Sequence, residues 1–91
     1  MNELNYRLLI KQQPEKVLRR VPSDIRKRID RKIRDLSTNP RPKGCKKLVG
    51  YDNLYRIRVG NWRISYAVED EELILLILEI SPRGDAYQSF G

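Results

Sequence analysis

The 91-residue sequence contains no histidine. Histidine is the side chain that most often moves protons near neutral pH, and it is the commonest ligand of transition metals. Its absence therefore argues against both kinds of site, and we expect no metal and no other cofactor. Any catalysis would have to use arginine, lysine, tyrosine, serine or a carboxylate.

The sequence also has a single cysteine, Cys45, and no apolar run long enough to span a bilayer. One cysteine excludes an internal disulfide and fits a reducing compartment. No secretory signal is visible at the N-terminus. We expect a cytoplasmic protein without membrane contact, folded as one domain over residues 1–91.

Acidic residues are scarce in the first half of the chain. Residues 1–50 hold 15 Lys and Arg against 5 Asp and Glu, a net charge of +10, whereas residues 51–91 carry a net charge of −3. The whole chain reaches +7, which predicts a polyanionic partner, nucleic acid above all. The cations of the second half are all arginines: Arg56, Arg58, Arg63 and Arg83.

The stretch YRIRVGNWRISYAV, residues 55–68, predicts a β-hairpin. Apolar and polar residues alternate on both sides of Gly60–Asn61, and this pair suits the positive φ angles of a two-residue turn. Such a turn fixes the register, with Val59 facing Trp62 and Arg58 facing Arg63. One face of the hairpin is then apolar or aromatic throughout, formed by Tyr55, Ile57, Val59, Trp62, Ile64 and Tyr66.

The other face of the hairpin carries Arg56, Arg58 and Arg63. Like charges on directly opposed residues destabilise a sheet, so this cluster is unexpected in a chain selected for stability alone. One interpretation is a cationic platform for phosphate, which arginine binds through its planar fork. The other is an ordinary outer face whose arginines extend separately into water. The hairpin alone does not decide between them.

The segment before the hairpin predicts a strand and two helices. Period-two alternation predicts a strand over residues 3–10, and Pro14 opens a short helix over residues 14–20. A stripe of Ile and Leu from Ile25 to Leu36 predicts a second helix, which Asn39–Pro40 ends. Basic residues cover its other sides, either as a solvated surface or as a non-specific grip on a nucleic-acid backbone.

The remaining segments complete a small α+β domain. A strand begins near Lys46, and the apolar run Leu73–Ile80 predicts an interior strand. The expected order is β-α-α-β-β-β, a mostly antiparallel twisted sheet with the helical hairpin packed on one face.

The segment KKLVGYDNLYRIRVGNWRISYAV, followed by an apolar strand and SPRGDAY, resembles the RelE/ParE superfamily of toxins from bacterial and archaeal toxin–antitoxin systems. The resemblance covers nearly the whole chain, including the basic helical pair and the Arg-x-x-x-Tyr near the C-terminus. It is closer to the RelE branch than to the ParE branch, and it implies the RelE-like microbial RNase fold.

Members of the RelE branch are metal-independent endoribonucleases that cut mRNA in the ribosomal A site and so inhibit translation. The resemblance implies that Arg63 and Arg83 hold the phosphate, that Arg56 and Arg58 bind the flanking backbone, and that Tyr87 acts as general base or stacks on a base. Contacts with RNA or the ribosome would come from basic residues of the helix and the next segment: Arg26, Lys27, Arg31, Arg34, Lys46 and Lys47.

The residue before the C-terminal arginine departs from the family. Many relatives have histidine there, whereas this chain has Pro82, so that position has no proton-transfer group. A relative that binds without cutting therefore stays open as an alternative. So does a ParE-like inhibitor of DNA gyrase, although the arginine set argues against it.

The resemblance also implies partners. A cognate antitoxin would wrap and neutralise the toxin, and the complex would repress its own operon on operator DNA. The other expected partners are the 70S ribosome and mRNA, and the free toxin is expected to be monomeric.

Overall fold

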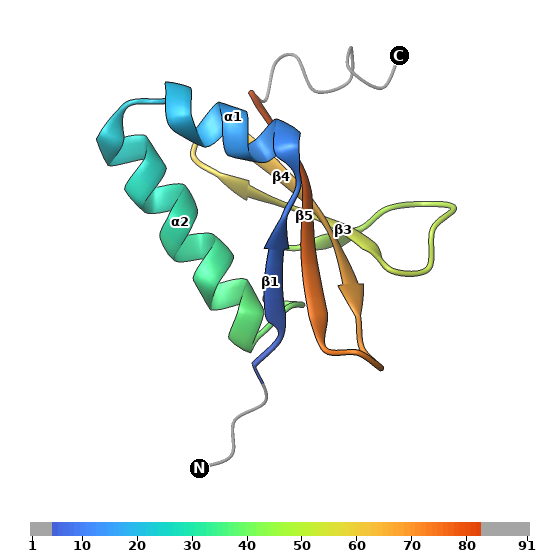
Figure 1. Ribbon diagram of the computed structural model, residues 1–91. Coiled ribbons are helices and arrows are strands. Elements are labelled where there is room, and N and C mark those ends of the chain that lie inside the picture. Colours follow the sequence, from blue (N-terminus) through green and yellow to red (C-terminus); the bar gives the residue numbers. More distant parts are fainter. Residues whose placement is uncertain (1–4, 83–91) are drawn as a thin grey trace.

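A computed structural model describes residues 5–82 of the chain. Two helices lie on one side of a twisted sheet (Figure 1). The elements are β1 (Arg7–Ile10), α1 (Gln12–Arg20), α2 (Ser23–Thr38), β2 (Lys46–Lys47), β3 (Leu54–Val59), β4 (Trp62–Glu69) and β5 (Ile74–Pro82). The predicted α+β class is confirmed. The strand predicted near Lys46 is the two-residue β2, so the sheet has five strands where the predicted order had four. None of the helices in residues 5–82 is long and apolar enough to cross a membrane.

The strands form one mixed sheet in the order β1-β5-β4-β3-β2. β1 and β5 run parallel, and the other three pairings are antiparallel. The predicted hairpin register is confirmed, with Val59 opposite Trp62 and Arg58 opposite Arg63. Gly60 has a φ of +60°, whereas Asn61 has no positive φ. This pattern matches a type II′ turn, in which only the first central residue needs a positive φ.

The two helices cover the apolar side of the hairpin. α2 presents the predicted stripe, of which Ile29, Ile33 and Leu36 are buried. They belong to the same core cluster as the inward-facing hairpin residues Tyr55, Ile57, Ile64 and Tyr66. The opposite side of the sheet has no helix against it in the described part of the chain (Figure 1), and we call it the helix-free face.

A β-bulge in β5 changes which of its residues face the helices. β4 pairs Ser65 with Glu79 and the next residue, Tyr66, with Ile77, so the pairing skips Leu78. The core residues of β5 are consequently Leu75, Ile77 and Ile80. Uninterrupted alternation from Leu75 would have turned Glu79 toward the helices, because side chains alternate between faces along a strand. The bulge turns Glu79 to the helix-free face instead.

A polar network joins the loop after α2 to the turn between β4 and β5. Arg41 donates from Nη2 to Asp70 Oδ2 at 2.7 Å and from Nε to the Tyr55 hydroxyl at 2.9 Å. The Tyr6 hydroxyl donates to Asp70 Oδ1 at 2.7 Å. The hydrogen bonds that Asp70 accepts, chiefly from Arg41 and then from Tyr6, hold the pKa of the Asp70 carboxyl below its ordinary value. The network therefore stabilises the end of the sheet away from the hairpin turn.

Two other side chains attach the helical segment to the strands. The Gln13 amide donates to the Ile80 carbonyl and accepts from the Ile80 N–H, both at 3.1 Å. Gln13 belongs to α1, which begins at Gln12, two residues before the predicted start of this helix. The buried Tyr66 hydroxyl donates to the Pro40 carbonyl at 2.7 Å, and burial raises the pKa of this phenol.

Candidate nucleic-acid interface

Three arginines, Arg56, Arg58 and Arg63, lie together on the helix-free face, and we call them the arginine cluster. Arg58 is directly opposite Arg63, where Cβ atoms stand about 5 Å apart. Arg56 lies two residues along β3 and faces Ser65. The register thus brings together three of the five residues that the sequence assigned to catalysis.

Arg63 carries an unusual buried donor. Its Nε is buried and has no hydrogen-bond partner within residues 5–82. Buried donors in native proteins nearly always have a partner, so an unpaired one requires an explanation. Residues 5–82 contain two ion pairs, Arg19–Glu15 and Arg41–Asp70, and neither involves the arginine cluster. Arg63 as a whole is only partly buried, so a bound anion such as a phosphate would supply a counter-charge to its guanidinium.

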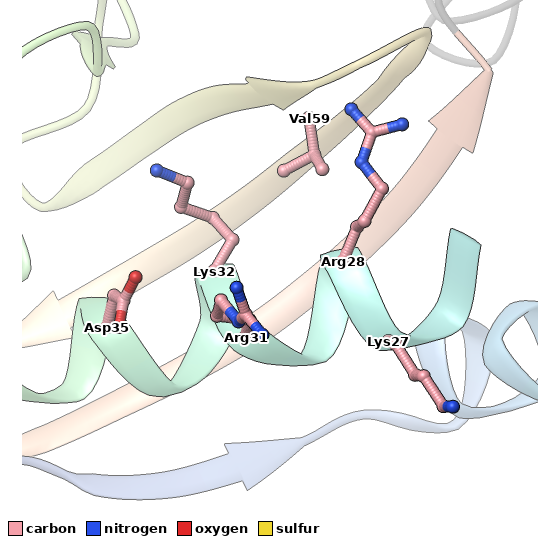
Figure 2. Close-up of a pocket in the computed structure, with 6 residues that line it drawn as sticks. All are labelled: Lys27, Arg28, Arg31, Lys32, Asp35 and Val59. Carbon is pink, nitrogen blue, oxygen red and sulfur yellow. The ribbon is translucent and has the colours of Figure 1, made fainter. Parts of the chain in front are cut away.

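A second cationic surface lies between α2 and the edge of β3, and we call it the α2–β3 groove. Figure 2 shows its first part, where Arg28 and Lys32 extend from α2 toward Val59 on β3 while Lys27 points away. The second part continues past Lys32 to reach the arginine cluster. The first part is lined by Lys27, Arg28, Arg31, Lys32, Asp35 and Val59, and the second by Lys32, Lys43, Gly44, Lys46, Arg56, Ile57 and Arg58. Each part encloses about 350 Å³.

The edge of β3 contributes main-chain groups to the α2–β3 groove. β2 pairs only with Tyr55 and Arg56, so residues 57–59 have no partner strand on that side within the described residues. The Leu54 carbonyl points to the β2 side, where it accepts from the Leu48 N–H at 2.9 Å. Outward and inward groups alternate along an antiparallel strand, so the N–H of Arg58 also points outward. Main-chain N–H groups are common phosphate donors.

α2 contains two like-charge pairs beside the α2–β3 groove, among opposite-charge pairs such as Asp24–Arg28 and Arg31–Asp35. Lys27 and Arg31, and likewise Arg28 and Lys32, are like charges four residues apart on an exposed surface. Each such pair costs about 0.2–0.5 kcal/mol. An anionic ligand in the α2–β3 groove would remove this repulsion.

Only half of the six residues that the sequence assigned to RNA contact line the α2–β3 groove. Lys27, Arg31 and Lys46 line the α2–β3 groove. Arg34 lies on the outer side of α2 beside Asp30, and Arg26 and Lys47 line neither part of the groove.

Sequence reasoning missed Arg28, Lys32 and Lys43 as groove residues. Arg28 and Lys32 are spaced four apart on one flank of the apolar stripe, which is the signal that could have identified them. Two other predicted catalytic residues, Arg83 and Tyr87, lie outside the described residues.

Known proteins are similar to this chain in both sequence and fold. The family model described as the ParE toxin of the type II toxin–antitoxin system, parDE, matches residues 5–87. RelE1 of Methanocaldococcus jannaschii is 38% identical over 77 residues, which cover 81% of this chain and 86% of the relative.

Two solved structures extend this similarity to three dimensions. The archaeal RelE–RelB complex from Pyrococcus horikoshii has a TM-score of 0.79 at 32% identity, covering 88% of this chain and 97% of that one. The RelB–RelE antitoxin–toxin complex from Methanococcus jannaschii has a TM-score of 0.73, also at 32% identity, covering 91% of this chain and 99% of that one.

Proposed function

Because this chain belongs to the RelE/ParE superfamily of toxins from type II toxin–antitoxin systems, we propose that it is an endoribonuclease that cuts mRNA in the ribosomal A site without a metal. The observation that carries this proposal is the arginine cluster, in which the buried Arg63 Nε has no hydrogen-bond partner among residues 5–82. Cations held in advance on a rigid sheet suit a reaction that develops negative charge on phosphorus.

The proposed reaction is an internal transfer at one phosphate. The 2′-oxygen loses its proton to a base and attacks the adjacent phosphorus, forming a dianionic phosphorane. The bond to the 5′-oxygen then breaks and that oxygen takes up a proton, which leaves a cyclic phosphate and a 5′-hydroxyl. In this scheme Arg63 and Arg83 hold the phosphorane oxygens, Arg56 and Arg58 bind the flanking phosphates, and Tyr87 is the base or stacks on a nucleobase.

The α2–β3 groove supplies the second part of the proposal. It joins the arginine cluster through Arg56 and Arg58 and continues along α2. Clustered Lys and Arg side chains bind a nucleic-acid backbone without reading its sequence. We assign to this groove the contact with mRNA or ribosomal RNA that positions the reacting phosphate over the cluster.

A cognate antitoxin is the proposed protein partner. The similar toxins from Pyrococcus horikoshii and Methanococcus jannaschii were solved in complexes with RelB. By analogy, a partner of this kind would neutralise the present chain and form with it an operator-binding repressor. The free toxin would act as a monomer in the cytoplasm.

Primer extension on a defined mRNA tests the enzymatic proposal, with and without programmed 70S ribosomes. We expect cuts only with ribosomes, inside the A-site codon, and their loss in Arg63→Gln. The matched control is Arg20→Gln, which removes the same charge from an exposed position at the end of α1. Equal cutting by wild type and Arg63→Gln would refute the assigned site, and no cutting by folded wild type would refute the activity.

A DNA gyrase inhibitor is the second candidate, because the matching family model is the one described for ParE toxins. A supercoiling assay with purified gyrase separates the two candidates. Inhibition of gyrase by a protein that leaves ribosome-bound mRNA intact would favour this second function.

A further inference from the structure

An apolar groove opens on the helix-free face beside the arginine cluster. Its walls are Leu48, Val49, Tyr51, Leu54 and Leu78, and it encloses about 430 Å³. Pockets for small organic ligands start at about 300 Å³. The groove is therefore large enough for one planar aromatic ring system.

Two side chains of this groove are exposed to a degree that packing does not explain. Val49 is 95% exposed and Tyr51 is 58% exposed, and within residues 5–82 Leu9 is the only other large hydrophobic residue that is exposed. Exposed apolar side chains that gather in one place, rather than singly, mark binding surfaces. The segment from Leu48 to Tyr51 thus presents apolar surface to the solvent and not to the core.

Polar groups also line the apolar groove. Ser65 and Glu79 are opposite each other on β4 and β5, and both line it. The bulge that skips Leu78 is the reason why Leu78 and Glu79, consecutive in sequence, both reach this groove. A ligand here would meet apolar walls together with a hydroxyl and a carboxylate.

Arg56 connects the apolar groove to the cationic surfaces. It lines both the apolar groove and the α2–β3 groove. A nucleotide whose phosphate binds Arg56 would therefore have its base within reach of the apolar groove. This charge complementarity, and the continuity of the two grooves, point to a nucleic-acid occupant.

We propose that the apolar groove is a nucleobase subsite for single-stranded RNA, and that it prefers bases with an exocyclic amino group. Bases of single-stranded RNA are bound by stacking on aromatic side chains and by hydrogen bonds to their Watson–Crick edge. Tyr51 supplies the aromatic surface. The Glu79 carboxylate accepts hydrogen bonds only, so it pairs with the amino groups of adenine and cytosine and with the N1–H and amino group of guanine. The one Watson–Crick donor of uracil, its N3–H, lies between two carbonyl oxygens that a carboxylate repels, so uracil should bind less tightly.

The inference deepens the proposed function, since it assigns a base preference to the same RNA-binding face. Its test uses RNA that cannot be cut, so that binding is measured apart from cleavage. Fluorescence anisotropy would give the Kd of the full chain for 2′-O-methyl hexamers of adenosine, cytidine and uridine. We expect wild type to bind the adenosine and cytidine hexamers roughly tenfold more tightly than the uridine hexamer.

Variants assign the effect to the groove. Tyr51→Ala should weaken all three hexamers roughly tenfold, and Tyr51→Phe should bind like wild type because it keeps the ring. Glu79→Gln should lose the discrimination against uridine, because an amide can donate to the uracil carbonyl. The control Glu72→Gln makes the same charge change at an exposed position in the turn before β5 and should keep the preference. Thermal unfolding would establish that each variant is folded.

Two outcomes would overturn the inference. One is that Glu79→Gln still prefers the adenosine and cytidine hexamers to the uridine hexamer, while Tyr51→Ala binds all three hexamers as tightly as wild type does. The other is a loss of binding to a purified antitoxin, but not to RNA, in Tyr51→Ala, which would make the groove a protein-docking surface. A wild type that shows the base preference but cuts no mRNA would refute the proposed activity and leave the subsite standing.

Discussion

Replacing Arg28 and Lys32 together by Gln should lower the salt dependence of RNA binding. Both side chains extend from α2 into the α2–β3 groove (Figure 2). Eight cationic residues of the described part of the chain line the groove. If two cations share each phosphate, the groove binds about four phosphates, which for a single strand gives a slope of log K against log salt of roughly −3.

That slope corresponds to a roughly 50-fold loss of affinity between about 50 and 200 mM salt. The double variant removes one pair of cations, so the slope should become shallower by about 0.7. The measurement is a titration of a labelled single-stranded RNA at four or more salt concentrations.

The matched control is the double variant Arg26→Gln with Arg34→Gln. It lowers the net charge by the same amount on the same helix, but neither residue lines the α2–β3 groove. We expect its slope to stay near that of wild type. An equal change of slope in both double variants would mean that RNA responds to the total charge of α2, and the groove would not be the binding site.

The buried contacts of the fold lead to two further predictions. Tyr66→Phe removes the donor to the buried Pro40 carbonyl and should lower the free energy of unfolding by about 1–3 kcal/mol in urea denaturation; no measurable loss would mean that water replaces the hydroxyl. Asp70→Asn tests the network with Arg41 and Tyr6. Because the pKa of Asp70 is lowered in the folded chain, its charge stabilises the fold above about pH 4, and this contribution is lost as pH falls further. The Tm of Asp70→Asn should therefore fall less steeply than that of wild type below about pH 4, and parallel acid profiles would contradict this.

The sequence predicted those parts of the structure in which a local rule fixes geometry. A two-residue turn leaves one register for the hairpin, so the opposition of Arg58 and Arg63 followed from the position of Gly60. The stripe on α2 likewise identified Ile29 and Ile33 as core, because helical periodicity and burial agree there.

Other parts depend on packing between distant segments and could not be predicted in this way. The bulge at Leu78 comes from the fit of β5 against β4, and it decides that Glu79 faces away from the helices. The hydrogen bonds of Gln13 to Ile80 join residues 67 positions apart. The choice of Arg28 and Lys32 over Arg26 and Arg34 as groove residues depends on how α2 lies against β3.

The parallel pairing of β1 with β5 has a consequence for the order in which the chain folds. Arg7 pairs with Ile74, so the first strand cannot join the sheet until almost the whole described chain has been synthesised. The β3–β4 hairpin, by contrast, closes through a two-residue turn and needs only local contacts. Contacts between distant residues form more slowly, because a long loop must be closed first. We expect the hairpin with its arginine cluster to form early and to offer α2 an apolar face, whereas α1, which Gln13 joins to Ile80, docks only after β5 has emerged.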